Sequence, residues 1–493
     1  MDELRTPMRL SLDTLPHLPK DVRIPSYSRA DLRAGMVHIG LGNFHRAHQA
    51  WYVHRLMDQG LALDWAICGA GVRPADAAQR DKMLEQDCLT TLIELDPAGK
   101  SAEVIGSMVD FTPVEPENGA LIAKMAESAI KIVAMTVTEG GYYQNAQGDL
   151  DVAHADIVHD VARPDTPKTA FGAIIAALKL RRDSGAGPFT CLSCDNLQGN
   201  GDILHQTVVG LARLSDPDLA SWIDTNVTFP NSMVDCIAAA TGPNELELVR
   251  SFGIDDAVPV THENFRQWVI EDKFCAGRPD WDKVGATFTD DVHAFEAMKL
   301  RLLNAGHQII ATPGELLSVE TISGTMAHPL IKGLLHKIAV EEIVPHVAAV
   351  PGMTPLAYLD LIETRFANPE IRDTIRRVAF DGSSRHAGFL HPILRDALAA
   401  GTPINGLALI EALWARMCAG TREDGTTIDP NDPHWDTLTA QAIIAKNTPI
   451  SWIQQKQFYG NLSQNKRFAD AFQNALNSVW EKGATSTIQN YIE

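Results

Sequence analysis

Short apolar runs alternate with helix-like segments through the first half of the chain. Segments with helical periodicity occupy 47–60, 75–86 and 170–185, and the last of them ends at a glycine, as helices commonly do. The runs that predict buried strands are MVHIG (36–40), DWAICGAG (64–71), LTTLIEL (89–95), IKIVAMTV (130–137) and FTCLSC (189–194). This alternation predicts an α/β domain built on an open, mainly parallel sheet.

The pattern changes after VGATFTDDV (284–292), where long segments of helical periodicity replace the strands. A chain of 493 residues also exceeds what a single hydrophobic core usually organises. We therefore predict two domains, an α/β domain over residues 1–285 and a mostly α-helical domain over residues 286–493. The segments that carry the helical prediction are 293–312, 329–347 and 406–420.

Acidic side chains outnumber basic ones, with 62 Asp and Glu against 42 Lys and Arg, for a formal charge of −20. Such a surface repels phosphate backbones and anionic bilayers, so we expect neither nucleic acid nor membranes as partners. The start of the chain lacks the apolar run of a secretory leader, and no apolar run is long enough to span a bilayer. With seven cysteines at no repeating spacing, the chain is expected to be cytoplasmic and its thiols reduced.

A glycine-rich turn follows the first predicted strand, in GLGNFHRAHQA (40–50). Gly40 permits a tight turn from strand to helix, Gly42 lets the backbone approach a pyrophosphate, and the helix start offers N–H groups to anionic oxygens. His45 stands where the usual third glycine would be, so the dinucleotide fingerprint is incomplete. The turn favours a Rossmann-type NAD-binding domain, and an ordinary glycine turn is the alternative.

A ribose-binding acid is expected at the end of the second strand, but none follows it directly. Asp76 comes a few residues late, with Arg73 close by. Asp76 could accept a hydrogen bond from the ribose 2′-hydroxyl, whereas Arg73 could tolerate a 2′-phosphate. NAD is therefore favoured and NADP is not excluded; a role for Asp76 as the cap of the next helix is the alternative.

One predicted helix in the second half carries Lys299, Asn304 and His307, which fall within an arc of roughly 140° at about 100° per residue. Desolvation among Leu and Met lowers the pKa of a lysine, so Lys299 is a candidate base that needs no metal. Asn304 could donate to an alkoxide-like oxygen, His307 could orient a hydroxyl, and Glu296, one turn earlier, could relay protons to water. The alternative is an amphipathic helix whose lysine reaches solvent.

A second polar cluster, SCDNLQGNG (193–201), follows the strand at 189–194. Asn196 could supply a second donor to the same oxygen, or it could close an Asx turn. Cys191 and Cys194 form a C-x-x-C pair, but no second pair completes a zinc site, and we expect both thiols to be buried in the strand. The sequence therefore predicts no metal site.

With these segments in view, the chain resembles the polyol-specific long-chain dehydrogenase/reductase family from residue 36 to the C-terminal region. The resemblance implies an N-terminal Rossmann-type NAD-binding domain with extensions and a mostly α-helical substrate-binding and catalytic domain. It also implies zinc-independent, NAD-dependent oxidation of a secondary hydroxyl of a sugar alcohol, with D-mannitol to D-fructose as the expected reaction. The motifs are GLGNFHRAHQA, LDWAICGAGVRPAD, VTEGGYY (137–143), SCDNLQGNG, FPNSMVD (229–235), WVIEDKF (268–274), GRPDWDKVG (277–285), FTDDV and K-x4-N-x2-H.

The resemblance also implies a role for each site residue. Lys299 is the general base, Asn196 and Asn304 form the oxyanion site, and His307 and Glu296 position substrate and relay protons. Asp235, Arg377 and Arg385 are expected to contact the polyol. The residues expected at the cofactor are Gly40, Gly42, Asn43, Phe44, His45, Arg46 and Asp76.

Two departures from the family keep other functions open. Arg385 stands where lysine is common, and a guanidinium can grip a carboxylate with two hydrogen bonds, so a hexuronate reductase acting on fructuronate/mannonate or tagaturonate/altronate is the alternative. Ala75 stands where a second acid is usual, which weakens the exclusion of NADP. A non-enzymatic NAD-binding sensor is a further alternative. The resemblance also implies a monomer whose partners are a polyol and its ketose.

Overall fold

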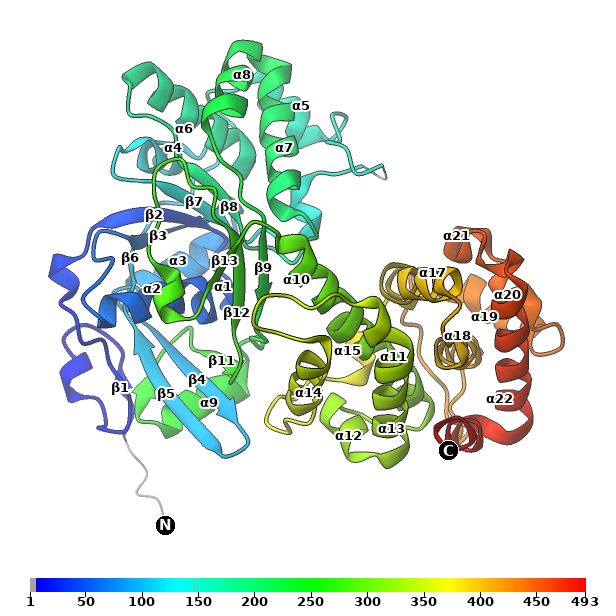
Figure 1. The fold of residues 1–493 in the computed structure, drawn as a ribbon. Coiled ribbons are helices and arrows are strands. Elements are labelled where there is room, and N and C mark those ends of the chain that lie inside the picture. Colours follow the sequence, from blue (N-terminus) through cyan, green and yellow to red (C-terminus); the bar gives the residue numbers. More distant parts are fainter. Residues whose placement is uncertain (1–5, 146) are drawn as a thin grey trace. The chain divides into compact units, whose positions relative to one another are not determined.

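Five parallel strands form the central sheet of the first half of the chain, in the order β6-β3-β2-β7-β8 (Figure 1). β2 lies where the strand order reverses, which is where such sheets bind ligands, outside the carboxyl ends of the strands. Four of the predicted strands correspond to β2, β3, β7 and β8. The five strands are β2 (Ala34–Ile39), β3 (Ala66–Ala70), β6 (Met108–Phe111), β7 (Ile132–Met135) and β8 (Thr190–Ser193).

The computed structural model describes residues 6–145 and 147–493. The chain forms two units, Met1–His293 and Ala294–Glu493. The predicted boundary lay near residue 285. The first unit extends beyond it because β13 (Thr287–Thr289) pairs in parallel with β12 (Gln267–Glu271) of that unit.

Both faces of the central sheet are covered, because successive strand residues point to opposite sides. Val37 and Ile39 of β2 pack into a core with α4, α6, α7 and α8, whereas Met36 packs into a second core with α2. The helices of this unit are α1 (Asn43–Ala47), α2 (Gln49–Asp58), α3 (Asp76–Leu84), α4 (Gly119–Ala126), α5 (Ala155–Ala162), α6 (Ala170–Ser184), α7 (Asn200–Ser215), α8 (Pro217–Asn226) and α9 (Pro243–Ser251).

One predicted strand does not belong to the central sheet. The run at 89–95 forms β4 (Thr90–Asp96), which pairs antiparallel with β5 (Gly99–Ile105) and parallel with β11 (Val260–Glu263). Its apolar pattern is that of any buried strand, so the pattern did not reveal its partners. The remaining strands are β9 (Ser232–Asp235), which pairs antiparallel with β12, and the short pair β1 (Met8–Arg9) and β10 (Ile254–Asp255).

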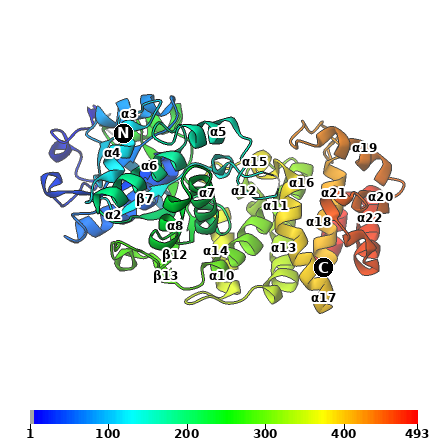
Figure 2. The ribbon, with the colours of Figure 1, turned by 90° about the horizontal axis from the view of Figure 1, so that it is seen from above.

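The second unit is helical in the part of the chain described here, and α11, α13 and α18 pack side by side within it (Figure 2). Three of its helical turns are π-helical: η5 (Lys299–Asn304), η6 (Ala339–Ile343) and η8 (His386–Leu390). The α-helices are α10 (Val292–Met298), which begins in the first unit, α11 (Ala305–Leu316), α12 (Ile322–Ala327), α13 (Pro329–Ile338), α14 (Pro355–Phe366), α15 (Ile375–Ala379), α16 (Gly382–Arg385), α17 (His391–Ala400), α18 (Asn405–Met417), α19 (Trp435–Ala445), α20 (Ile450–Ile453), α21 (Lys456–Tyr459) and α22 (Lys466–Ile492).

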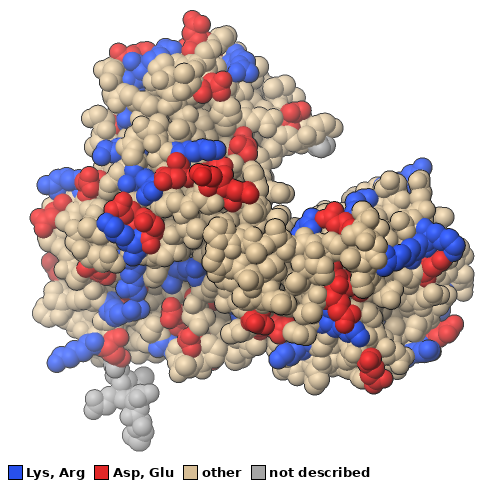
Figure 3. Space-filling model, in the orientation of Figure 1, with Lys and Arg blue, Asp and Glu red and all other residues tan. Residues whose placement is uncertain are grey.

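Among the residues that the structure describes, no helix combines the length and the apolar character needed to cross a bilayer. On the face drawn in Figure 3, basic side chains are interspersed with acidic ones. This distribution and the formal charge of −20 are unlike the clustered basic surface of a nucleic-acid-binding protein.

Candidate active site

The glycine turn after β2 has the backbone geometry that the motif predicted. Gly40 has φ +92°, and a Cβ there would lie 2.1 Å from the Thr136 carbonyl oxygen at the end of β7. Gly42 precedes α1 in extended conformation, and a Cβ on it would meet no atom within 4 Å. The turn therefore requires glycine at the first position and leaves open space beside the backbone at the second.

Asn43 and Arg46 of this motif are engaged within the protein. The Asn43 amide donates to the Ala239 carbonyl oxygen at 2.5 Å, and its oxygen accepts from Arg46 Nη2 at 2.6 Å. Arg46 is 2% exposed and also donates to the Val258 carbonyl oxygen. The two side chains thus fix the turn against the backbone at Ala239 and Val258.

His45, the residue in the third glycine position, is buried beneath the turn. Its ring stacks on His38 of β2 with centroids 3.5 Å apart. Burial lowers the pKa of His45 well below its usual value, so the ring is neutral. Within the described chain neither ring nitrogen has a hydrogen-bond partner. Phe44 is half-buried and stacks on His48 at 4.8 Å.

Asp76 folds back onto the end of β3. A Cβ on Gly71, just after that strand, would lie 2.3 Å from the Asp76 Cβ. One carboxylate oxygen accepts from the backbone N–H of Val72 at 3.1 Å and of Arg73 at 3.0 Å, and the other lies 3.3 Å from Arg73 Nη2. The carboxylate therefore reaches the strand end where a ribose-binding acid is expected, while also holding its own turn.

Asn196 lies beyond the carboxyl end of β8, exposed, beside a buried carboxylate. The carboxylate of Asp195 accepts from the backbone N–H groups of Val137 and Thr138, at 3.0 and 2.9 Å, and from the Tyr142 hydroxyl at 2.8 Å. Burial raises the pKa of Tyr142, which keeps its hydroxyl protonated as a donor. Asp195 thereby joins the segment after β7 to the segment that carries Asn196.

Asp235 is the last residue of β9 and is 7% exposed. It lies opposite Gln267 in the antiparallel ladder with β12, which fixes the position of its backbone. Asp235 and Asn196 both belong to the first unit, and the other predicted catalytic and substrate-contacting residues belong to the second.

Lys299 and Asn304 lie at the two ends of the π-helical turn η5. A regular α-helix was predicted here, and for η5 that prediction was wrong. Because π-helical hydrogen bonds join residues five apart, Lys299 and Asn304 are one turn apart on the same side, closer in direction than an α-helix would place them. Lys299 is 7% exposed and Glu296 is 4% exposed, so the lysine does not extend into solvent as the amphipathic alternative required.

His307 lies on α11, where its ring stacks on Phe366 of α14 with centroids 4.4 Å apart. The next residue, Gln308, is 2% exposed and donates to the Val378 carbonyl oxygen of α15 at 3.0 Å. Arg385 Nη1 donates to the same oxygen at 2.8 Å. The Val378 carbonyl oxygen thus joins α11, which carries His307, to α15, which carries Arg377, and to the side chain of Arg385.

Arg377 projects its side chain outward, 60% exposed, beside a buried acid. Its Nε donates to Asp373 Oδ1 at 2.5 Å and its Nη2 donates to Asp373 Oδ2. These hydrogen bonds with Asp373 raise the pKa of Arg377 further. Asp373, Gln308 and Asp195 were not found by sequence reasoning; the one available signal was the spacing of four between Asp373 and Arg377, which matches a turn of helix.

One group of potential metal ligands occurs among the described residues, formed by His54, Asp58 and Glu103. His54 Nε2 lies 3.3 Å from Asp58 and 3.6 Å from Glu103. Arg55 also lies 2.9 Å from Glu103, so the carboxylate already has a cationic partner. The C-x-x-C cysteines, Cys191 and Cys194, are buried, as predicted.

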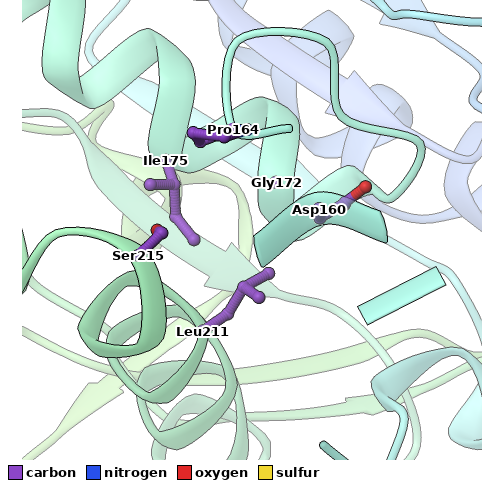
Figure 4. Close-up of a pocket in the computed structure, with 6 residues that line it drawn as sticks. All are labelled: Asp160, Pro164, Gly172, Ile175, Leu211 and Ser215. Atoms are coloured by element: carbon purple, nitrogen blue, oxygen red, sulfur yellow. The ribbon is translucent and has the colours of Figure 1, made fainter. Parts of the chain in front are cut away.

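A small hollow lies between α5, α6 and α7 in the first unit (Figure 4). Its volume of about 10 Å³ is no more than a single water molecule needs, so it does not accommodate a sugar or a nucleotide. The residues that line it are Asp160, Pro164, Gly172, Ile175, Leu211 and Ser215.

The order of the central sheet and its glycine turn are features of the dinucleotide-binding domain of a dehydrogenase. Two family models match the chain in tandem: the mannitol dehydrogenase Rossmann domain over residues 34–283 and the mannitol dehydrogenase C-terminal domain over residues 291–480. The chain belongs to the mannitol dehydrogenase family, and the resemblance to polyol dehydrogenases predicted from the sequence is confirmed.

The chain is similar over nearly its whole length to named members of this family. A mannitol 2-dehydrogenase of Cereibacter sphaeroides is 54% identical, across 96% of this chain and 100% of the relative. A mannitol 2-dehydrogenase of Pseudomonas fluorescens, solved as a ternary complex with NAD and D-mannitol, superposes with a TM-score of 0.84 at 38% identity, covering 98% of this chain and 99% of the other. A substrate-free D-sorbitol dehydrogenase superposes with a TM-score of 0.90 at 33% identity, covering 97% and 100%.

Proposed function

We propose that the protein catalyses the NAD-dependent oxidation of D-mannitol to D-fructose and the reverse reduction. The observation that carries the proposal is the 54% identity to a mannitol 2-dehydrogenase over the full length of that relative. The Pseudomonas fluorescens enzyme, bound to NAD and D-mannitol, supports both the cofactor and the substrate.

The residues after β2 and β3 fit a dinucleotide. Gly42 leaves open space beside an exposed backbone, as close approach of a pyrophosphate requires, and the Asp76 carboxylate lies at the end of β3. Bound NAD would supply the hydride acceptor. We assign to Gly40 and Gly42 the shaping of the phosphate site, and to Asp76 the preference for a ribose 2′-hydroxyl over a 2′-phosphate.

We assign the role of general base to Lys299. Its burial supports this assignment, because desolvation favours the neutral amine that can accept a proton from a substrate hydroxyl. Glu296, also buried, precedes it by three residues and would pass the proton onward. A lysine base makes the proposed reaction independent of zinc.

Asn196 and Asn304 are the proposed oxyanion donors. Each would donate a carboxamide N–H to the reacting oxygen as negative charge develops, and loss of either should raise the barrier by about 3 kcal/mol. His307 would hold a substrate hydroxyl, with its ring orientation fixed by stacking on Phe366. In ketose reduction Lys299 would return the proton.

Asp235, Arg377 and Arg385 are the proposed polyol contacts. An aspartate accepts from sugar hydroxyls and a guanidinium donates to them, so together they can orient a chain of hydroxyl groups. The named relatives are polyol dehydrogenases, so the hexuronate alternative is not favoured. The monomeric state implied by the family resemblance and the cytoplasmic location expected from the composition of the chain are part of this proposal, and light scattering in solution tests the first.

The test is a direct assay of the purified protein. With NAD and a panel of polyols, D-mannitol should give the largest kcat/KM, measured as growth of NADH absorbance, and NADP should be a poorer acceptor. With NADH, fructose should be reduced more efficiently than fructuronate or tagaturonate. Preference for a hexuronate would contradict the proposed substrate, and binding of NADH without turnover of any substrate would instead indicate a sensor.

A further inference from the structure

Asp373 and Arg377 form a side-on ion pair in the second unit. Both carboxylate oxygens accept from the guanidinium, one from Nε at 2.5 Å and the other from Nη2. The acid is 8% exposed, whereas the arginine side chain is 60% exposed. Asp373 therefore lies on the buried side of the Arg377 guanidinium, and the opposite edge of the guanidinium faces solvent.

The backbone around Asp373 is held firmly. The Asp373 carbonyl oxygen accepts from the Ile322 N–H at 3.0 Å, and Thr374 bridges to Thr321 in an antiparallel arrangement. The Thr374 hydroxyl also accepts from the Arg377 N–H at 3.2 Å, which caps α15. These contacts fix the direction in which the carboxylate faces Arg377.

Side-on pairing changes what Arg377 can offer a ligand. A guanidinium has five N–H donors, and the pair uses Nε–H and one Nη2–H. The remaining donors can still bind a hydroxyl or ketone oxygen. The buried carboxylate cancels the positive charge, however, so the pair presents hydrogen-bond donors with no net charge to attract a carboxylate.

The second arginine, Arg385, is hydrogen-bonded to the residue that follows Arg377. Its Nη1 donates to the Val378 carbonyl oxygen, which also accepts from Gln308. The residue after Arg377 is thus joined both to Arg385 and to the helix that carries His307. The Asp373–Arg377 pair is therefore tied to the part of the second unit in which the proposed catalytic residues lie.

We propose that Asp373 determines the substrate class by occupying the guanidinium of Arg377, so that the protein selects neutral polyols and ketoses over hexuronates. This rests on the proposed function, in which Arg377 contacts the substrate. Asp373 is a specificity-determining residue that acts through Arg377. A purely structural pair, which stabilises α15 alone, would change stability without changing the choice of substrate.

The decisive measurement is the ratio of kcat/KM for fructuronate to that for fructose, with NADH as reductant. Asp373→Asn keeps the shape of the side chain and removes its charge, and Asp373→Ser is a second variant that removes both. Each should raise the ratio roughly tenfold or more, because hydrogen bonds to charged groups contribute that much to affinity. Adding Arg377→Ala to Asp373→Asn should remove the gain.

Asp272→Asn is the matched control. Asp272 is paired in the same side-on way with Arg278, through Nε at 2.7 Å and Nη2 at 2.9 Å, but lies in the first unit. Its loss should leave the ratio unchanged. Circular dichroism and thermal unfolding establish that each variant is folded.

The outcomes separate this inference from the proposed function. If the wild type prefers fructose and the ratio in a folded Asp373 variant stays within twofold of the wild-type ratio, the inference fails and the proposed function stands. If the wild type itself prefers fructuronate, the proposed function fails. A rise in the ratio that survives Arg377→Ala would also overturn the inference, because the effect would not pass through Arg377.

Discussion

Asp195 holds Thr138 in a backbone conformation of positive φ through a hydrogen bond of 2.9 Å from the Thr138 N–H to its carboxylate. Thr138 has φ +65°, a region that β-branched residues avoid and that costs on the order of 1–3 kcal/mol. The Val137 N–H and the Tyr142 hydroxyl donate to the same carboxylate, and these hydrogen bonds help to maintain the conformation of Thr138. The segment after β7 is therefore shaped by the residue that precedes Asn196.

Replacing Asp195 with Asn should lower both stability and activity. In this variant an NH₂ group replaces one of the two carboxylate oxygens, so a donor faces another donor where the oxygen accepted a hydrogen bond. The free energy of unfolding should therefore fall by about 3 kcal/mol. Displacement of Asn196 should lower kcat in mannitol oxidation. Denaturant unfolding and steady-state kinetics measure the two effects. Asp183→Asn removes an exposed partner of Arg182 and is the control, expected to match the wild type.

Replacing Lys299 with Ala should remove the base while leaving the fold intact. We expect kcat to fall about 10²- to 10⁴-fold, with NADH affinity little changed, because the lysine acts on the reacting proton. Small primary amines added to the variant should restore part of the activity. Lys332→Ala, an exposed lysine on α13, is the control. Turnover close to wild type in a folded Lys299→Ala protein would show that the lysine only packs.

Replacing Asp76 tests the choice of cofactor. Asp76→Asn keeps an oxygen that can accept from Val72 and Arg73 but removes the charge that repels a 2′-phosphate. The ratio of kcat/KM for NAD to that for NADP should therefore fall, by about tenfold if one charged contact is lost. Asp76→Ala should in addition loosen the turn and raise KM for both cofactors. An unchanged ratio in both variants would identify Asp76 as a structural cap.

Acid should destabilise the first unit through its buried histidines. Burial lowers the pKa of His38 and of His262 to about 3. Below pH 6.5 the unfolded chain binds protons that the folded protein does not, so stability is lost as the pH falls from 6.5 towards 3. From pH 6.5 to 5.5 each histidine should cost about 1 kcal/mol.

Denaturant unfolding at both pH values measures this loss. His38→Gln should be less stable at neutral pH, because the ring lies within hydrogen-bonding distance of Gln49 and Thr136, but its stability should depend less steeply on pH. An equal slope in wild type and variant would assign the acid sensitivity to other groups.

Prolonged treatment with a chelator should leave mannitol oxidation unchanged, since the proposed base is a lysine. Metal content and activity are measured on the same samples. Activity that falls in proportion to zinc and returns when zinc is added would contradict the lysine mechanism. Glu103→Gln then serves as a further check, because it would alter metal content only if the group around His54 holds an ion.

Strands and helices of the first unit followed well from hydrophobic periodicity. β2, β3, β7 and β8 lie within two residues of the predicted runs, since each is a short strand buried along nearly its whole length. The pairing of β4 with β5 and β11 could not be predicted, because an apolar run does not specify which edge it meets.

At the candidate site, the sequence predicted residue types better than contacts. The apolar neighbours of Lys299 left a buried lysine and a lysine that reaches solvent as alternatives, and the structure shows it buried. The π-helical turn was not predicted, because local propensity does not distinguish it from an α-helix. Arg46 was predicted to contact a cofactor, yet its guanidinium binds the carbonyl of Val258, which is more than two hundred residues away in sequence. Such long-range partners are properties of the folded chain.

The π-helical turn of η5 amounts to a single inserted residue in an otherwise continuous helix from α10 to α11. Winding the same residues as a uniform α-helix would rotate every side chain before the turn by about 100° relative to His307, because a π-helical turn accommodates one residue more than an α-helical turn. A change of this kind alters neither the composition nor the length of the helix appreciably. The relative directions of Glu296, Lys299 and His307 thus depend on how the helix is wound between them as much as on the identities of the residues.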